Sequence, residues 1–421
     1  MRSRPLLQAL ALGTVLVLVS CTDQTEPVAP TDQTPDPAFA ARQGTGNDPN
    51  TLGRVVPGFG GFFLDAQGTP TVYLKDAGRR GDTERALAPY LRTRGAAAGR
   101  LQVRKGDYDW AELDRWLSEA SAEALAQPGA VYVDADEASN RVRIGVERGA
   151  GGRIRGSLGR LNIPGAAVVI EETEPVRFAA TPGPQPKAKP GNGSSLQGQV
   201  RPIIGGVQIN FPGFLCTLGF SAGGSFITNS HCTNVQGGTE GTPYWQPTRT
   251  IAPTQIATEA ADPTYFSGRD GCPSGRVCRF SDASRAAYQP GADFTVGRIA
   301  RTQRPGRSLT ITGSFTIRRE GAAVPGSTVN KVGRTTGWSQ GRVTAVCVNT
   351  NVSGTNVTQL CQNFVSATVG SGDSGSPVFE IDSGTDVGLV GILWGGSGSQ
   401  SFVFSPLSQV EDEIGSLSTT F

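Results

Sequence analysis

The spacing of apolar residues changes about halfway along the chain. Residues 201–421 consist of short apolar segments separated by Gly, Ser, Thr and Asn, and helical periodicity is nearly absent until "SPLSQVEDEI" close to the end. The chain is rich in Gly (57) and Pro (28), which favours many turns between short strands. A stretch of about 220 residues with this pattern can form two packed β-barrels. We therefore expect an all-β double β-barrel domain over 201–421.

Residues 55–175 show helical as well as strand periodicity. The segment "DWAELDRWLSEASAEAL" begins at Asp109, has Glu112 in the position of a capping box, and carries a stripe of apolar residues on one helical face. Alternating apolar residues predict a hairpin at 131–146, and "LQVRK" and "AAVVIEE" predict strands around a second helix at "GGRIRGSLGRL". This order predicts a small α+β domain of split β-α-β type ahead of the β-domain.

Two further segments have compositions that cannot build a packed core. Residues 22–54 are dominated by Thr, Pro, Asp, Gln and Gly and predict a flexible tether. Residues 176–200 include "TPGPQPKAKPGNGSSLQGQ", which predicts a Pro/Gly-rich linker that is exposed and open to proteolysis. The linker would separate the α+β domain from the β-domain.

The start of the chain has the features of an export signal. Two arginines precede an apolar run at residues 6–19, which suits a signal peptide and is shorter than the about 20 residues that span a bilayer. The run ends in "LVSC", which resembles a bacterial lipobox and predicts a signal peptide over 1–21 with a lipid on Cys21. Ordinary secretion, with cleavage near "AFAA" at 38–41, is the alternative. Both predict a secreted or cell-envelope protein.

The charge balance argues against two classes of partner. Lys and Arg number 38 against 36 Asp and Glu. A nucleic-acid-binding protein needs a basic face, and an anionic membrane attracts clustered positive charge. We therefore expect no nucleic-acid partner, and membrane contact only through an N-terminal lipid.

The six cysteines after residue 215 fall into close pairs, which suggests three disulfides and an oxidising compartment. A zinc site is the alternative, but it needs four Cys or His ligands at finger-like spacing, and the chain has a single histidine. We therefore expect no metal and no cofactor. The pairs are Cys216 with Cys232, Cys272 with Cys278, and Cys347 with Cys361.

Two short stretches carry the candidate chemistry. "SFITNSHCTN" holds the lone histidine, His231, and "GSGDSGSPVF" holds Ser374 between Gly372 and Gly375. A serine hydroxyl needs a base to take its proton, and the oxyanion that forms needs backbone N–H donors. Flanking glycines let the N–H groups of Gly372 and Ser374 point the same way. The pattern differs from the α/β-hydrolase elbow, because Ser376 replaces its second glycine.

"FITNSHC" and "GDSGSPV" together resemble the chymotrypsin-like serine proteases. "IIGGVQINF" at 203–211, "KVGRTTGWSQGRV" at 331–343 and "GILWGGSG" at 391–398 resemble the bacterial branch of α-lytic protease and the streptogrisins. The resemblance covers about half of the chain. It implies a serine endopeptidase that cleaves protein or peptide substrates through an acyl-enzyme, and a disulfide between Cys216 and Cys232 that holds the histidine loop. A packed core histidine is the alternative for His231.

The resemblance also implies a carboxylate that follows the histidine and opens a strand. Asp293 in "ADFTVGRIA" fits, because it follows a Pro-Gly turn and precedes alternating apolar residues. Asp282 and Asp270, in loop-like sequence, are rivals. The expected catalytic triad is therefore His231, Asp293 and Ser374.

Further residues are assigned by the same resemblance. Asp373 is expected to form a buried pair with Lys331 that supports the oxyanion loop, although Lys331 as a solvated charge is equally consistent with the sequence. Thr368 is placed at the base of the primary substrate pocket, and no aspartate lies there to favour Arg or Lys substrates. A small or apolar side chain is the default. The remaining pocket residues are Trp394, Gly395 and Gly396.

The sequence departs from the family pattern beside the expected catalytic residues. Asn229 and Ser230 replace small residues before the histidine, and Trp394 stands where a serine usually supports the catalytic acid. These departures permit an alternative, a catalytically inactive chymotrypsin-fold binding protein of the cell envelope. A structural envelope lipoprotein would explain the N-terminus alone.

The family architecture implies a role for residues 55–175. They would be a pro-region that aids folding, blocks the cleft and is removed near 200–202, so that the chain's own pro-region is a partner of the protease. A permanent binding module is the alternative for this domain.

Overall fold

The computed structural model describes residues 48–93, 101–179, 195–269, 271–303 and 305–420. The expected signal peptide, Cys21 and most of the tether and linker lie outside these ranges. No helix within them is long and apolar enough to cross a membrane.

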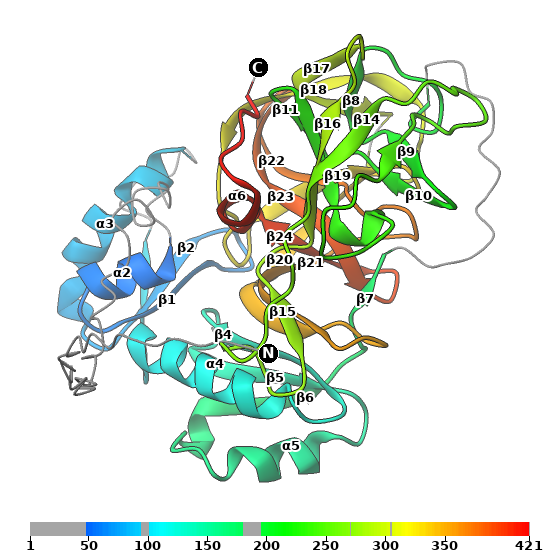
Figure 1. The fold of residues 1–421 in the computed structure, drawn as a ribbon. Coiled ribbons are helices and arrows are strands. Elements are labelled where there is room, and N and C mark those ends of the chain that lie inside the picture. The colour runs from blue at the N-terminus through cyan, green and yellow to red at the C-terminus, as the bar shows by residue number, and fades with distance from the viewer. Residues whose placement is uncertain (1–47, 94–100, 180–194, 270, 304, 421) are drawn as a thin grey trace, which may run out of the picture.

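The N-terminal half contains two three-stranded units of the same type, the first a separate sheet and the second the end of the large sheet (Figure 1). In each, an antiparallel hairpin is followed by a helix and by a third strand parallel to the second strand. The expected split β-α-β sheet is therefore not formed, because the strand at Gln102–Lys105 pairs with the strand at Pro70–Leu74 and not with the later hairpin. The first unit is β1 (Phe59–Leu64), β2 (Pro70–Leu74), α3 (Arg80–Thr93) and β3 (Gln102–Lys105); the second is β4 (Ala130–Asp136), β5 (Arg141–Val146), α5 (Gly151–Leu158) and β6 (Val168–Glu172).

Helix α4 (Trp110–Ala124) joins the two sheets and has the predicted capping box. The Asp109 side chain accepts a hydrogen bond from Glu112 N, and the Glu112 side chain accepts one from Asp109 N. A shorter helix, α2 (Pro49–Val55), lies where the end of the tether was expected. It buries Leu52 in the same apolar cluster as α4.

The C-terminal half has the expected all-β architecture, and "SPLSQVEDEI" forms its one long helix among the described residues, α6 (Leu407–Ile414). One sheet has the order β11-β12-β16-β14-β13, and a larger sheet has the order β15-β21-β24-β23-β22-β19-β20 before it continues into the N-terminal half. The first strands are β8 (Ile203–Gly205), β9 (Gln208–Phe211), β10 (Phe214–Thr217), β11 (Phe220–Ala222), β12 (Ser225–Asn229), β13 (Pro243–Tyr244), β14 (Ala257–Ala261), β15 (Val277–Arg279) and β16 (Ala283–Tyr288). The later strands are β17 (Phe294–Thr302), β18 (Ile311–Glu320), β19 (Thr328–Gly333), β20 (Gly337–Asn351), β21 (Val357–Ser366), β22 (Pro377–Ser383), β23 (Asp386–Ser397) and β24 (Ser401–Pro406).

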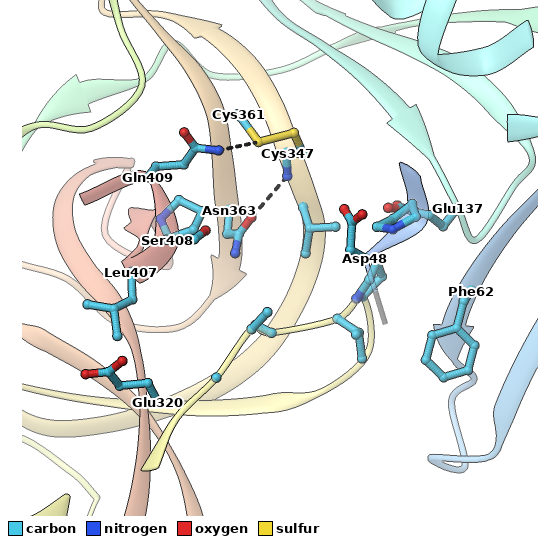
Figure 2. A pocket seen from close by; sticks show the side chains of 18 of the residues that line it. Asp48, Phe62, Glu137, Glu320, Cys347, Cys361, Asn363, Leu407, Ser408 and Gln409 are labelled. Atoms are coloured by element: carbon cyan, nitrogen blue, oxygen red, sulfur yellow. Dashed lines mark hydrogen bonds between the residues drawn. A yellow bond between two sulfur atoms is a disulfide. The ribbon is translucent and has the colours of Figure 1, made fainter. Parts of the chain in front are cut away.

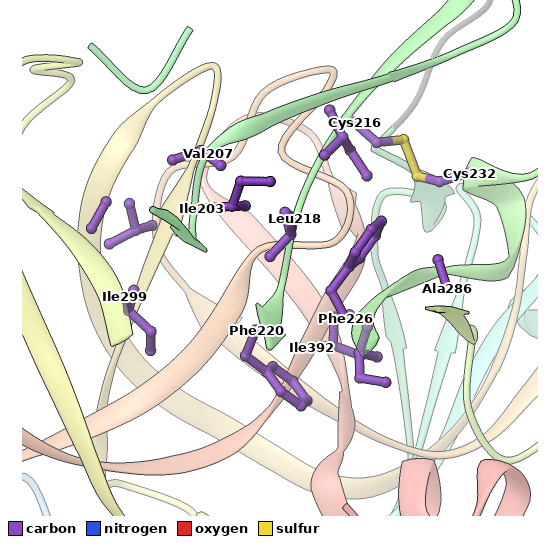
Figure 3. Packing of buried hydrophobic residues seen from close by; sticks show 14 of the residues in the cluster. Ile203, Val207, Cys216, Leu218, Phe220, Phe226, Cys232, Ala286, Ile299 and Ile392 are labelled. Carbon is purple, nitrogen blue, oxygen red and sulfur yellow. A yellow bond between two sulfur atoms is a disulfide. The ribbon is translucent and has the colours of Figure 1, made fainter. Parts of the chain in front are cut away.

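One large apolar cluster connects strands that are distant in sequence (Figure 3). It contains Phe220 and Phe226 from β11 and β12 and Ile392 from β23, all fully buried. Burial of such side chains is worth about 1.5–3 kcal/mol each. The disulfide between Cys216 and Cys232 lies at the edge of the same cluster.

The two halves of the molecule share a sheet. β20 pairs with β4 in antiparallel fashion, with Asn349 opposite Val133. Side chains of β20 reinforce the contact, because Asn351 Nδ2 donates to the carbonyls of Leu125 and Ala130, both at 3.0 Å. The two halves are therefore joined by strand pairing together with side-chain hydrogen bonds.

A cavity of about 290 Å³ lies between the two halves, away from the residues with candidate chemistry. Phe62 and Glu137 face it from the N-terminal half, and the Cys347–Cys361 disulfide and Gln409 face it from the β-domain (Figure 2). Glu137 is 1% exposed, and neither of its carboxylate oxygens has a hydrogen-bond partner among the described residues.

Candidate active site

His231 and Ser374, 143 positions apart in the sequence, lie in hydrogen-bond contact. His231 belongs to a short 3-10 helix, η4 (Ser230–Cys232), which directly follows β12, and Ser374 lies in the turn before β22. The distance from His231 Nε2 to Ser374 Oγ is 2.8 Å. The histidine side chain is 5% exposed and the serine is fully buried. This geometry suits proton transfer from the hydroxyl to the imidazole.

The carboxylate that contacts the imidazole belongs to Asp282. One of its oxygens hydrogen-bonds His231 Nδ1, and the other accepts from the His231 backbone N–H at 3.3 Å. The prediction that Asp293 makes this contact is wrong. Asp293 is exposed, and its backbone carbonyl accepts from Ile203 N at 2.8 Å. The third candidate, Asp270, lies outside the described residues.

Strand pairing explains why Asp282 and not Asp293 lies beside the histidine. Both aspartates stand directly before a strand, Asp282 before β16 and Asp293 before β17. β16 is the partner of β12, and Asn229, at the end of β12, lies opposite Ala283. The residues that flank this pair, Asp282 and the η4 turn, are therefore neighbours. β17 pairs instead with β8 and β18, so Asp293 lies away from the histidine.

The residues that depart from the family pattern before the histidine fix this arrangement. Asn229 Nδ2 donates to the Asp282 carbonyl at 2.8 Å. Ser230 Oγ donates to Asp262 Oδ2 at 2.8 Å, and Asp262 in turn binds the fully buried Arg279 at 2.7 Å. Charge-assisted hydrogen bonds in such a dry environment are strong, so they hold the η4 turn against the aspartate loop.

Trp394 takes part in a second hydrogen-bonded network behind Asp282. The Trp394 indole N–H donates to Gln362 Oε1 at 2.7 Å, and Ser405 Oγ donates to the same oxygen at 2.9 Å. Ser405 Oγ also accepts from the Asp282 backbone N–H at 3.0 Å. Support for the acid therefore comes from Ser405. Gln362 and Ser405 were not predicted, because no short sequence motif marks either residue.

The loop before Ser374 is held by the predicted buried ion pair. Lys331 Nζ lies 2.7 Å from Asp373 Oδ2, and both side chains are fully buried. Burial alone would raise the pKa of Asp373, but the Lys331 ammonium, together with hydrogen bonds from Thr336 and the Thr335 backbone, holds that pKa below its ordinary value. Asp373 is therefore a charged anchor for the loop that carries Gly372.

The backbone of this loop requires its glycines. Gly372 has φ +92° and Gly375 has φ +90°, a conformation that side chains disfavour. At Gly375 a Cβ would also lie 2.0 Å from the Thr217 carbonyl oxygen. In this conformation Gly372 N–H donates to the carbonyl of Ala179 at 2.8 Å. The sequence predicted two oxyanion donors, the N–H groups of Gly372 and Ser374. Among the hydrogen bonds of the described residues, only that of the Gly372 N–H goes to the Ala179 carbonyl oxygen.

Ala179 ends a segment of the N-terminal half that lies across the candidate site. Its strand, β7 (Arg177–Phe178), pairs antiparallel with β23, with Phe178 opposite Gly395 and Arg177 opposite Gly396. Ala179 N donates to the Trp394 carbonyl at 2.9 Å. Residues 176–179, expected to belong to the exposed linker, therefore lie against the site, and Figure 1 shows β7 beside the β-domain.

The aromatic ring of Phe178 covers the imidazole. The ring centroids of Phe178 and His231 are 4.5 Å apart with an interplanar angle of 31°. The Trp394 ring meets Phe178 edge-on, at 5.7 Å and 66°. Offset and edge-to-face arrangements of this kind are favourable for aromatic rings.

The remaining predicted residues have the following places. Gly395 and Gly396 pair with the bound segment, and a Cβ on Gly395 would lie 2.6 Å from the Arg177 carbonyl oxygen. Thr368 is half-buried, and its carbonyl accepts from Ser339 Oγ at 3.1 Å. All three cysteine pairs form disulfides, as the structure has Cys216–Cys232, Cys272–Cys278 and Cys347–Cys361.

Solved structures similar to this chain are bacterial proteases of the kind that the motifs predicted. Chymotrypsin from Cellulomonas bogoriensis is 22% identical, with 52% of this chain and 99% of that chain covered, at a TM-score of 0.39. Protease A from Thermobifida fusca is 24% identical, with 52% and 98% covered, at a TM-score of 0.38. An α-lytic protease homologue is 19% identical, with 51% and 98% covered, at a TM-score of 0.38.

No family model and no curated protein matches the chain. The geometry of the site itself is therefore the basis for assigning a function to this chain.

Proposed function

We propose that the protein is an exported serine endopeptidase with a triad of His231, Asp282 and Ser374. The observation that carries the proposal is the chain of contacts from carboxylate to imidazole to hydroxyl, with Ser374 Oγ 2.8 Å from His231 Nε2. A hydroxyl, a base and a group that orients the base are the parts that acyl transfer needs.

The reaction would proceed through an acyl-enzyme. Ser374 Oγ attacks the peptide carbonyl carbon while its proton passes to His231 Nε2, and Asp282 stabilises the imidazolium through Nδ1. The Gly372 N–H donates to the oxyanion, and His231 returns the proton to the leaving amine as the C–N bond breaks. Water then hydrolyses the ester by the same route in reverse order, which restores the Ser374 hydroxyl.

The N-terminal half would act as a pro-region. Residues 176–179 occupy the cleft with main-chain hydrogen bonds on both sides, so a substrate could not bind while they stay there. Export by a signal peptide and a lipid on Cys21 belong to the same proposal and rest on the sequence of residues 1–21.

The alternative of an inactive binding protein loses its main support. Asn229 and Trp394 were the departures that permitted it, and both form hydrogen bonds that hold Asp282 or its neighbours in place.

Labelling with a fluorophosphonate, followed by peptide mass spectrometry, tests the proposal. We expect modification at Ser374 once the N-terminal half has been removed, and no labelling in a His231→Ala variant. Asp293→Asn is the matched control, because this exposed carboxylate lies away from the site, and it should label at the normal rate. Failure of the wild-type protein to label under any condition would refute the endopeptidase proposal.

A further inference from the structure

We infer that His231 and Trp394 form a binding site for an aromatic side chain, and that this site selects the residue just before the one at which the chain is cut. The inference rests on the proposed function, because it takes residues 176–179 as a substrate-like ligand of the same cleft. It adds a preference that the triad alone does not set.

The direction of the bound segment identifies which residue would be cut. The carbonyl of Ala179 accepts from the N–H of Gly372, two residues before Ser374, while Ala179 N donates to the Trp394 carbonyl. A carbonyl that points at the oxyanion donor is the one that the serine hydroxyl attacks. Ala179 is therefore the residue on the amino side of the scissile bond, and Phe178 is the residue before it.

Contacts farther along the segment fix its register. The Ser353 N–H donates to the Val176 carbonyl at 2.8 Å, and Ser397 Oγ donates to the Glu174 carbonyl at 2.9 Å. Together with the antiparallel pairing to β23, these bonds hold residues 174–179 in one alignment. A shift by one residue would turn every side chain to the opposite face.

The side chains of the segment differ in environment. Val176 is 1% exposed and Ala179 is 9% exposed, whereas Arg177 faces solvent. Phe178 lies between the rings of His231 and Trp394, with centroid distances of 4.5 and 5.7 Å. The Phe178 ring thus contacts two aromatic rings, and one of them belongs to the proposed base.

The residue at the cut occupies an apolar site. Ala179 is a member of a buried apolar cluster that also contains Ala367, Val369 and Phe402. Ala367 and Val369 flank Thr368 in the sequence, and Ala179 itself is 9% exposed, so its surroundings are apolar and largely closed to solvent. The structure therefore favours a small side chain at the cut, preceded by an aromatic one.

The same alignment identifies the first bond that the enzyme would break in its own chain. Ser374 Oγ attacks the Ala179 carbonyl carbon, the proton passes through His231 to the departing amine, and hydrolysis of the ester leaves a carboxylate on Ala179. The cut would lie after "VRFA", about twenty residues before the 200–202 site expected from the sequence.

Peptide substrates measure the preference directly. We would use the enzyme as released from the full chain, with the chromogenic peptides Val-Arg-Phe-Ala, Val-Arg-Gly-Ala and Val-Arg-Phe-Phe. We expect kcat/KM to be about tenfold higher for the first than for the second, which is what one well-packed aromatic contact gives. The third should be cleaved at least about tenfold more slowly than the first. Equal rates for the first two peptides would overturn the inference.

A Trp394→Leu variant separates recognition from general damage to the site. Loss of the ring should lower kcat/KM for the Phe-Ala peptide about five- to tenfold more than for the Gly-Ala peptide. A purely structural role for Trp394 would reduce both rates by the same factor and would contradict the proposed site.

Processing of the full chain gives an independent readout. Phe178→Gly should slow the cut after Ala179 about tenfold, while Arg177→Ala is the matched control and should leave its rate unchanged, because that side chain faces solvent. A protein that labels with fluorophosphonate but cuts itself elsewhere would refute this inference and leave the proposed function intact. A protein that does not label at Ser374 would refute the proposed function as well.

Discussion

Individual buried charged groups in the two halves of the molecule differ in how they are paired. In the β-domain the fully buried cations have partners, with Lys331 2.7 Å from Asp373 and Arg279 2.7 Å from Asp262. In the N-terminal half Glu137 is buried with neither oxygen hydrogen-bonded among the described residues, and the buried Asp134 lacks a partner for one oxygen.

Asp373 and Glu137 respond to pH in opposite directions. Because Asp373 has a lowered pKa, its stabilising contribution is present above the ordinary pKa of aspartate and is lost as the pH falls. Burial, and then the neighbouring carboxylates Asp134 and Asp136, raise the pKa of Glu137. Its protonated form therefore favours the folded state, and stability falls as the pH rises past its ordinary pKa.

This difference matches the proposed roles of the two halves. The β-domain would keep the loop of Ser374 assembled at neutral pH, where the Asp373 carboxylate is charged. The N-terminal half becomes less stable under the same conditions, which suits a part that is to be removed. Four substitutions test these roles.

The largest effect is expected at the acid of the triad. Asp282→Asn should lower kcat about 10⁴-fold, because the uncharged amide cannot stabilise the imidazolium and favours the wrong tautomer. Steady-state kinetics on a peptide substrate would measure it. Asp293→Asn is the control and should retain wild-type kcat; a loss at Asp293 equal to that at Asp282 would show that the local contacts described here do not identify the acid.

Removal of the buried cation comes next. Lys331→Met should lower the free energy of unfolding of the β-domain by about 3–5 kcal/mol, because it leaves Asp373 buried without its partner, and turnover should fall as the Gly372 loop shifts. Denaturant unfolding gives the first quantity. Arg318→Met, which breaks an exposed pair with Asp386, should cost less than about 1 kcal/mol. Unchanged stability and turnover in Lys331→Met would remove the contrast between the halves.

The N-terminal half should respond to the loss of an unpaired buried carboxylate. In a Ser374→Ala background, unfolding of this half should become easier as the pH rises from about 5 to 8, and Glu137→Gln should flatten that dependence and add about 1–3 kcal/mol at the higher pH. Asp107→Asn is the control, since Asp107 forms an exposed pair with Arg141. An identical pH profile in Glu137→Gln and the parent protein would contradict the proposed origin of the instability.

The smallest effect is expected behind the triad. Ser405→Ala removes the acceptor of the Asp282 backbone N–H and a donor to Gln362, so kcat should fall about fivefold, which corresponds to about 1 kcal/mol. The exposed Ser383→Ala should have no effect. If Ser405→Ala also has none, the network does not position the acid.

Structural features that depend on a few neighbouring residues could be predicted from the sequence. The change in apolar spacing gave the all-β half, the capping box gave α4, and the glycines around Ser374 marked a loop that only glycine can form, at φ +92° for Gly372. The spacing of the cysteines gave all three disulfides. Each of these signals lies within a few residues of the feature that it predicts.

The tertiary structure alone decided which aspartate meets the histidine and what occupies the cleft. Asp282 and Asp293 both stand directly before a strand in the structure, and only the pairing of β12 with β16 brings Asp282 to the histidine. Likewise, nothing in the composition of the predicted linker indicates that Phe178 lies on His231. Strand pairing and docking join residues that are distant in sequence, and their free energy depends on partners that a local pattern does not contain.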